Sequence, residues 1–331
     1  MLHRGRRRSL LLQTLFVVVL LAALAVAIAG LVPGSGRRLQ HAAPGWIGVA
    51  VLLELAALLS YAVLFHGVFS YGAYRLGYIR AAQIGLGELG AFVVVPTGAG
   101  GPALRIWALM RGEMRFAVVM TRSVIHIAIF NLPYLLAALG LGASVALGIG
   151  PGHAPLLVAL APLAVVAVGL MVAAGAIAYS RARPQPPRSR WRRIGWEVMA
   201  AVPNGVRELP GRLRRPFLVL SAAGYWACDC AVLVAAFHAA HGSAPIGVIV
   251  LAYMLGQLGN ALPLPGGVGG TEPIMLGVLT ASGVDLGLGA AAILLYRLVS
   301  LGLQALAGTV AVATLIPALR RSPETRAADT A

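Results

Sequence analysis

Long uninterrupted apolar stretches dominate the hydrophobic pattern of this chain, and short polar segments separate them. Each stretch has at least the roughly 20 residues that a helix needs to cross about 30 Å of hydrocarbon. We therefore predict six membrane-spanning helices, at residues 10–32, 46–69, 116–141, 155–179, 216–238 and 290–316. The predicted fold class is all-α, in a polytopic integral membrane protein.

Two glycine-rich segments interrupt this pattern and indicate an internal repeat. Leu-Gly-Glu-Leu-Gly at residues 86–90 matches Leu-Gly-Gln-Leu-Gly at residues 255–259, an offset of 169 residues. After each glycine segment an arginine lies inside an apolar run, Arg122 at 21 residues after Gly101 in the first half and Arg297 at 27 residues after Gly270 in the second. At the same offset of 169, Pro96, Gly98, Gly100 and Gly101 fall on Pro265, Gly267, Gly269 and Gly270. The two halves are therefore predicted to be repeats.

The helical stretches beside the glycines are mostly too short to span a membrane, at residues 81–95, 102–110, 246–262 and 273–281. Each pair predicts a re-entrant helical hairpin, with the first entering from the inside and the second from the outside, so the repeat has inverted topology. The chain then has about six full spans plus two re-entrant hairpins, or eight helices if each hairpin counts as a span. The predicted hinge residues are Pro96, Gly98, Gly100, Gly101, Pro265, Gly266, Gly267, Gly269 and Gly270. Broken helices inside a membrane are tolerated where they line a cavity, as in many secondary transporters.

Composition and charge placement point the same way. The chain is 59% hydrophobic and 11% charged, whereas soluble domains carry about 25% charged residues. The formal net charge of +16 is typical of nucleic-acid binding, but all 26 basic residues are arginines and nearly all fall on one side of the predicted topology. Only Arg37 and Arg38 fall on the other side, which is the positive-inside pattern. We therefore expect no nucleic-acid partner, and a multi-pass protein of a bacterial inner membrane with both termini cytoplasmic.

The polar segments divide the chain. We predict a basic cytoplasmic N-terminus at 1–9, a transmembrane domain at 10–317 with halves 10–180 and 216–317, a basic cytoplasmic linker at 181–215 and a cytoplasmic tail at 318–331. The first span reads as a retained anchor, because it is too long for the apolar region of a signal peptide. Within the linker, residues 191–202 have helical apolar spacing beside arginines, which favours either a helix on the anionic leaflet or a disordered basic loop.

Ionisable residues within the apolar runs are the candidate substrate site. A charge at the bilayer centre costs roughly 2.5–3.5 kcal/mol on insertion scales, so its presence suggests a function. The candidate substrate-binding residues are Arg122, Arg297, Glu272, Glu88, Arg105, Asp229 and Asn260. We expect Arg122 and Arg297 to pair with nearby carboxylates, Glu272 with Arg297 above all, and to bind phosphate when a substrate displaces the carboxylate. The alternative is a structural ion pair that pins the hairpins.

Other polar residues in the spans have a simpler explanation. Glu54, His66, His126, Asn131 and Gln304 either line the cavity or form hydrogen bonds between helices. The Gly-x-x-Gly spacings favour close helix packing, and no Gly-Lys-Ser/Thr follows the glycine loops, which argues against ATP binding. Cys228 and Cys230 lie two residues apart on a helix, so their side chains diverge and we expect neither a disulfide nor a metal site.

The second glycine segment carries a family resemblance. Asn-Ala-Leu-Pro-Leu-Pro-Gly-Gly-Val-Gly-Gly-Thr-Glu at residues 260–272, followed by Ala-Ile-Leu-Leu-Tyr-Arg-Leu at residues 292–298, resembles the lysylphosphatidylglycerol synthase transmembrane family, also called the flippase-like domain. The resemblance implies a membrane domain that moves lipids between leaflets. Two departures limit it. The chain ends about fourteen residues after its last predicted span, so we expect a stand-alone member without the aminoacyltransferase domain, and Ala103 stands where Glu272 stands in the second half.

Taken with the charges, this predicts lipid translocation or lipid-binding transport of an anionic or polar-headed lipid, with no enzyme activity, cofactor or metal. The expected partners are membrane lipids, with a lipid- or glycan-biosynthesis enzyme as a candidate protein partner. The alternatives are an intramembrane enzyme acting on a polyprenyl phosphate lipid, a small-solute secondary transporter and a partner-dependent scaffold. The interpretation as an enzyme is weakened because no Ser-Arg-Ser loop or clustered pair of glutamates accompanies the glycine motif.

Overall fold

The computed structural model is an all-α bundle that describes residues 32–95, 99–146, 156–183, 185–187, 189–261 and 265–320. Among these residues, four helices are long and apolar enough to cross a membrane, namely α3 (Pro44–Phe69), α6 (Phe116–Ala146), α9 (Pro216–Ala239) and α12 (Leu286–Arg320). Proline begins α3 and α9, where its missing N–H leaves no intrahelical bond unmade. Their outer faces expose large apolar side chains such as Leu59 and Leu220, which suits contact with lipid.

Two further predicted spans have different outcomes. Helix α7 (Leu156–Ala182) is 27 residues long and covers the span predicted at 155–179, and its last sixteen residues form an apolar helix. Residues 10–31 of the first predicted span lie outside the described residues, as do the basic N-terminus and residues 321–331 of the tail. The prediction of a retained first anchor therefore stays a prediction.

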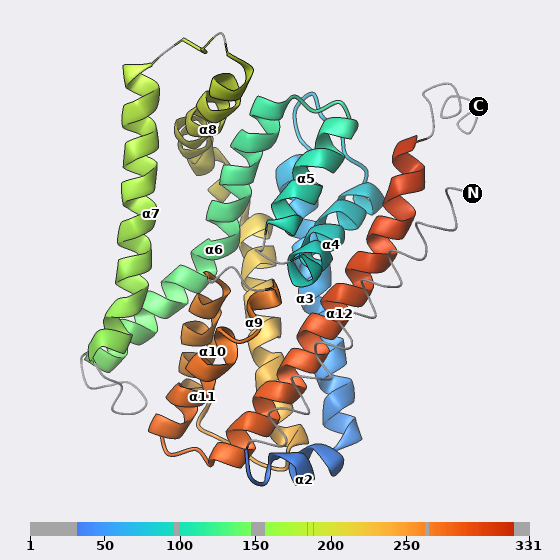
Figure 1. Ribbon diagram of the computed structural model, residues 1–331, viewed down its shortest axis with the longest axis vertical. Helices are drawn as coiled ribbons and strands as arrows, with labels where there is room; N and C mark the ends of the chain where they lie inside the picture. The colour runs from blue at the N-terminus through green and yellow to red at the C-terminus, as the bar shows by residue number, and fades with distance from the viewer. Residues whose placement is uncertain are drawn as a thin grey trace.

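Four short helices form two hairpins in the positions that the sequence predicted. The elements are α4 (Tyr78–Val94), α5 (Gly100–Arg111), α10 (Ile246–Gly256) with the 3-10 turn η1 (Gln257–Ala261), η2 (Pro265–Gly267) and α11 (Thr271–Ala281). Helix α4 packs on α5, and α10 packs on α11. In Figure 1 the first hairpin lies toward the upper end of the bundle and the second toward the lower end.

The polar linker folds as one long helix rather than a short helix or a disordered loop. Helix α8 (Arg190–Leu213) has 24 residues and continues through Pro203 and Pro210. It packs against α6 and α7 and lies at the upper end of the bundle in Figure 1. Its side chains divide by exposure, with Ala201 buried and Trp191 largely exposed, so this segment has an amphipathic pattern.

The centre of the bundle is made of α3, α9 and α12. Helix α3 packs along α9, and α12 packs against both α9 and α4. At the contact of α4 with α12, a Cβ on Gly90 would lie 2.6 Å from the Cα of Gly308, so only glycine allows the two backbones to come this close. One hydrophobic core surrounds the first hairpin and another surrounds the second, and the space between the two cores is where the candidate site lies.

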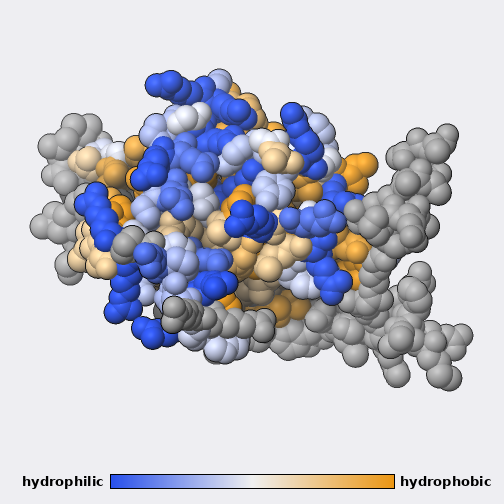
Figure 2. All heavy atoms as spheres, turned by 90° about the horizontal axis from the view of Figure 1, so that it is seen from above, coloured by the Kyte–Doolittle hydropathy of each residue, from blue (hydrophilic) through white to orange (hydrophobic). Residues whose placement is uncertain are grey.

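Polar residues gather at the upper end of the molecule. Seen from above, this end is covered mainly by hydrophilic side chains (Figure 2). It carries Arg75 of the α3–α4 connection and Arg80 at the start of α4, Arg111 at the end of α5 and Arg115 of the α5–α6 connection, and the arginine-rich helix α8. Arg37 and Arg38 lie in α2 (Ser35–Gln40), which Figure 1 places at the opposite end. These described arginines are thus separated from Arg37 and Arg38 in space, whereas the arginines of residues 4–8 and 321–326 lie outside the described residues.

Candidate functional site

The glycine turn of the second hairpin positions an acidic residue at the start of a helix. Gly267 and Gly269 have φ angles of +68° and +87°, a region of backbone conformation that favours glycine. A Cβ on Gly259 would collide with the backbone nitrogen of Thr271, so η1 and the start of α11 are in direct backbone contact. Glu272 follows as the second residue of α11, where the exposed N–H groups of a helix favour a negative charge.

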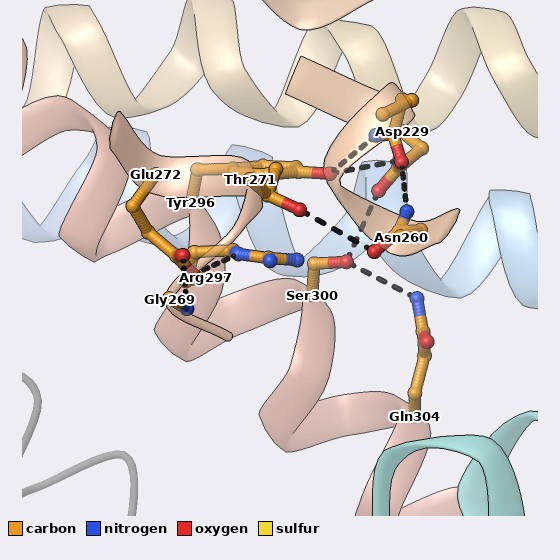
Figure 3. Close-up of polar contacts among 10 residues, drawn as sticks. Asp229, Asn260, Gly269, Thr271, Glu272, Tyr296, Arg297, Ser300 and Gln304 are labelled. Carbon is orange, nitrogen blue, oxygen red and sulfur yellow. Dashed lines mark hydrogen bonds and ion pairs between the residues drawn. The ribbon is translucent and has the colours of Figure 1, made fainter. Parts of the chain in front are cut away.

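Glu272 forms the ion pair that the sequence predicted. Its Oε1 lies 2.7 Å from the Nε of Arg297 in α12, and its Oε2 accepts a hydrogen bond of 2.7 Å from the backbone N–H of Gly269 (Figure 3). The two side chains are only 7% and 3% exposed. The pair therefore joins the second hairpin to a membrane-spanning helix at a buried point.

The first half has its own buried pair, but its geometry differs. The Nη1 of Arg105 in α5 donates a hydrogen bond of 2.6 Å to Oε1 of Glu88 in α4, so this pair closes within one hairpin. The sequence identified both residues as candidates without predicting that they bind each other. Glu88 supplies from α4 the carboxylate that is missing at Ala103 in the first glycine motif.

Asp229 of α9 lies at the centre of a hydrogen-bond network. Its Oδ2 accepts bonds from the hydroxyl groups of Tyr253 at 2.6 Å and Tyr296 at 3.0 Å. Its Oδ1 accepts a bond of 3.1 Å from the hydroxyl of Ser300. The Nε2 of Gln304 donates both to Ser300 and to Glu54 of α3, at 3.1 Å each. One carboxylate thus links α9, α10 and α12, and through Gln304 it reaches α3.

Asn260 extends the network to the second glycine turn (Figure 3). Its Nδ2 donates to Oε1 of Gln257 at 2.6 Å, and Gln257 donates in turn to the hydroxyl of Tyr296 at 3.3 Å. The hydroxyl of Thr271 lies 3.4 Å from Oδ1 of Asn260. The side chain of Asn260 therefore ties η1 to α11 and to the residues around Asp229.

A cavity of about 480 Å³ lies between the two hairpins. Both ion pairs reach it, through Glu88, Arg105 and Arg297, and so do Asp229 and Asn260. The Nε of Arg105 and the Nη2 of Arg297 are buried and have no hydrogen-bond partner among the residues that the structure describes. The aromatic residues of the wall are Tyr61, Phe92, Phe130, Tyr134, Tyr225, Trp226 and Tyr296. The cavity thus combines an apolar wall with two guanidinium groups that have unused donors.

The cavity opens toward an apolar face of the bundle. Of its lining residues, Ile127 of α6 is 53% exposed and Pro102 of α5 is also exposed. Phe92 of α4 and Leu258 of η1, which also line the cavity, are half-buried. Leu136, further along α6, is 60% exposed as well. The entrance therefore lies beside α6 and is bordered by apolar side chains.

Arg122 does not belong to this site, and the expectation that it pairs with a carboxylate is wrong. It lies in the second turn of α6, and its guanidinium donates to the backbone carbonyls of Phe69 at 2.5 Å and Tyr71 at 2.8 Å. The guanidinium carbons of Arg122 and Arg212 lie 3.8 Å and 3.0 Å from the centre of the Tyr71 ring. Burial, followed by the hydrogen bond of its hydroxyl to Glu208, raises the pKa of Tyr71. This cluster fastens the α3–α4 connection to α6 and α8.

The remaining sequence candidates divide between the cavity and other places. His126, Asn131 and Gln304 line the cavity, whereas Glu54 lies behind Gln304 and His66 stacks on Tyr78 with ring centres 3.7 Å apart. Of the predicted hinge residues, Gly101 and Gly266 line the cavity. Gly100 begins α5, Pro265 begins η2, and Gly270 directly precedes α11. Pro96 and Gly98 lie outside the described residues.

Sequence reasoning missed Ser300 and Tyr253 and gave no role to Tyr296. Arg297, Ser300 and Gln304 follow one another at spacings of three and four in α12, which places them on one face of a helix. This polar stripe inside an apolar span was a usable signal. Tyr253 had no such signal, because a single tyrosine in the apolar helix α10 is equally typical of packing.

A family model described as "Lysylphosphatidylglycerol synthase TM region" matches residues 10–308. The matched range includes both hairpins and every residue named in the two ion pairs. No curated protein matches the chain by sequence.

Proposed function

The chain belongs to the lysylphosphatidylglycerol synthase transmembrane-region family, and from this premise we propose that it is a lipid translocase. The family and the apolar helices make it a multi-pass membrane protein with a lipid-related function. We propose further that its substrate is a lipid with an anionic head group, which passes through the cavity while the acyl chains stay in the bilayer. In this proposal the protein performs no covalent chemistry.

One observation carries the proposal. Arg105 from the first half and Arg297 from the second line the same cavity, and each has a buried N–H without a partner in the described part of the chain. A guanidinium group donates to phosphate oxygens in a fixed planar geometry. Two such groups are suited to hold one phosphate between them.

The carboxylates regulate this anion site. Glu88 and Glu272 neutralise the two guanidinium groups when the cavity is empty, because an unpaired charge in this environment is costly. An arriving phosphate takes the unused donors first and then competes with the carboxylates for the remaining ones. Release of the phosphate restores the ion pairs, so the substrate is held without being trapped.

The entrance and the size of the cavity support a lipid rather than a free solute. A volume of about 480 Å³ falls in the range of small-ligand pockets, roughly 300–1,000 Å³, which is suited to a head group. The exposed apolar residues Ile127 and Pro102 at the entrance suit contact with acyl chains. A lipid can thus enter sideways, with its head group inside and its chains outside.

We propose that the two hairpins are re-entrant and form an inverted repeat, with their glycine turns near the membrane midplane. Helices α4, α5, α10 and α11 have 17, 12, 11 and 11 residues, and all are shorter than the roughly 20 residues of a span. We also propose that the arginine-rich upper end is cytoplasmic, following the positive-inside rule, in a bacterial inner membrane. A lipid- or glycan-biosynthesis enzyme is the partner we propose as the source of the lipid.

The test is lipid exchange in liposomes that contain the purified full-length protein. An impermeant reductant removes the fluorescence of labelled phosphatidylglycerol in the outer leaflet only. The fraction of fluorescence that is lost therefore reports how much of the inner-leaflet lipid has reached the outer leaflet. We expect faster exchange than in empty liposomes, and loss of this exchange in the double variant Glu272→Gln with Arg297→Gln. Because the double variant removes both charges together, it avoids leaving one charge buried alone.

The matched control is Arg207→Gln, which removes an exposed arginine from α8 and should leave exchange unchanged. Wild-type rates equal to those of empty liposomes with phosphatidylglycerol and with other phospholipids would refute the translocase. If the protein instead released phosphate from a polyprenyl diphosphate, and Glu272→Gln abolished that release, the proposal of a non-enzymatic protein would be wrong.

A further inference from the structure

Glu54 is a buried carboxyl group that the proposed lipid site does not use. It lies in α3, is 0% exposed, and is not among the residues that line the cavity. Its Oε1 accepts one hydrogen bond from Gln304. Its Oε2 is buried and has no hydrogen-bond partner in the described ranges. An ionised carboxylate with an unsatisfied oxygen in such a place is strongly disfavoured.

A second carboxyl group lies beside it. Hydrogen bonds connect Glu54 to Asp229 through two side chains, since Gln304 donates both to Glu54 and to Ser300, and Ser300 donates to Asp229. Asp229 is 3% exposed and faces the cavity. Two neighbouring carboxylates in a medium of low dielectric constant cannot both be ionised without a compensating cation. A proton on one of them removes the repulsion and provides a donor for the other.

Among the residues that the structure describes, no cationic side chain forms an ion pair with either carboxyl group. The titratable groups that face Glu54 or Asp229 are Tyr225, Cys228 and Cys230 of α9, Tyr253 of α10 and Tyr296 of α12. All of these are neutral when protonated. The guanidinium groups of Arg105 and Arg297 are bonded to Glu88 and Glu272 instead.

The arrangement of donors favours a proton over a metal cation. A sodium or calcium ion requires several oxygen lone pairs that point at one place. Here three hydroxyl groups direct their hydrogens at Asp229, and Gln304 directs an amide N–H at Glu54. Oxygens already used as acceptors by these donors are poorly available to a metal ion, whereas a proton needs only one free oxygen, such as Oε2 of Glu54.

We propose that Glu54 and Asp229 share one proton and form the coupling site of the transport proposed above, on which this inference rests. Asp229 exchanges the proton with the cavity, and Glu54 behind it holds the proton in the bilayer interior. Gain or loss of the proton changes the charge that Tyr253, Tyr296 and Ser300 bind, and these residues join α10 to α12. The protonation state thereby acts on the position of the second hairpin.

The experiment measures lipid distribution under a pH gradient, in liposomes with full-length protein and fluorescent phosphatidylglycerol, with the membrane potential clamped by potassium and valinomycin. If one proton moves with each lipid, a gradient of about one pH unit shifts the leaflet ratio by up to about tenfold. We expect this shift in the wild type. In Glu54→Gln we expect normal exchange without a gradient and no shift with one.

Glu113→Gln is the matched control, because it makes the same chemical change at an exposed carboxyl group and should retain the full shift. Infrared difference spectra of the purified protein give a second readout that does not need transport. They should contain a protonated-carboxyl band that Glu54→Gln removes and Glu113→Gln preserves.

The outcomes separate this inference from the proposed function. Exchange without a gradient tests the translocase alone. Normal exchange in the wild type with no response to the pH gradient, or an unchanged response in Glu54→Gln, would overturn the proton site while leaving the translocase in place. A shift that follows a sodium gradient at constant pH would replace the proton with a metal cation and would likewise overturn the inference.

Discussion

Each hairpin takes part in one buried ion pair between a glutamate and an arginine, but the two pairs connect different elements. In the first hairpin, Glu88 and Arg105 bind each other across α4 and α5, so the pair is internal. In the second, Glu272 binds Arg297 of α12, so the pair connects the hairpin to a spanning helix. Breaking the first pair loosens a hairpin, but breaking the second releases a hairpin from its neighbour. In the proposed transport, the second hairpin is therefore the one whose position we expect a bound phosphate to change.

The largest effect is expected from removal of one member of the second pair. Arg297→Ala leaves the carboxylate of Glu272 buried without its cation, and such losses cost about 3–5 kcal/mol. We expect the greatest fall in the free energy of unfolding in detergent, together with loss of lipid exchange. Glu272→Gln combined with Arg297→Gln should recover much of the stability but not the exchange. Recovery of both would show that the charges serve only to hold the hairpin.

The second prediction compares the arginines that follow each hairpin. Arg122→Gln replaces two charge-assisted hydrogen bonds to backbone carbonyls by neutral ones at most, a loss of roughly 1 kcal/mol for each bond. The α3–α4 connection should loosen, which lowers the unfolding temperature. Lipid exchange per folded molecule should stay normal, because Arg122 does not line the cavity. A loss of exchange in a variant of normal stability would place Arg122 in the substrate path.

The third prediction concerns the backbone contact in the second glycine turn. Gly259→Ala places a methyl group against the backbone of Gly270 and Thr271, and overpacking of this kind costs about 1–3 kcal/mol. Gly277→Ala in α11 is the control, because a Cβ there meets nothing within 4 Å. The unfolding temperature of Gly259→Ala should be clearly lower than that of Gly277→Ala. Equal unfolding temperatures would mean that the turn can open without strain.

The smallest effect is expected at alkaline pH in the Tyr71 cluster. Because the pKa of Tyr71 is raised in the folded protein, its contribution to stability is complete below about pH 10, the ordinary tyrosine value. That contribution is lost as the pH rises through the higher folded value. Tyr71→Phe retains the ring between the arginines and should show a shallower alkaline fall in unfolding temperature. An identical fall in both proteins would contradict this assignment.

Much of the fold was accessible from the sequence because its strongest signals are local. The apolar runs gave α3, α6, α7, α9 and α12, and the glycine segments gave both hairpins. The pairing of Glu272 with Arg297 was also predictable, because both are charged residues within apolar stretches of the second half, where each needs a partner of opposite charge. These features depend on hydrophobicity, length and spacing, which a single sequence contains.

The predictions that were wrong or missing concern the depth of a residue within the bundle and the contacts between segments that are distant in the sequence. Arg122 and Arg297 look alike in sequence, but Arg122 is the seventh residue of α6 and Arg297 the twelfth of α12. This difference places Arg122 near the polar end of the molecule. The pairing of Glu88 with Arg105 and the gathering of hydroxyl groups at Asp229 arise from tertiary packing that spacing alone does not encode.

Helix α12 gives the two hairpins a common mechanical element. At Gly308 its backbone lies against Gly90 of α4, and eleven residues earlier its Arg297 holds α11. In the lipid transport that we propose, a tilt of α12 would therefore change its contacts with both hairpins at once. The two sides of the cavity would then not open independently of each other.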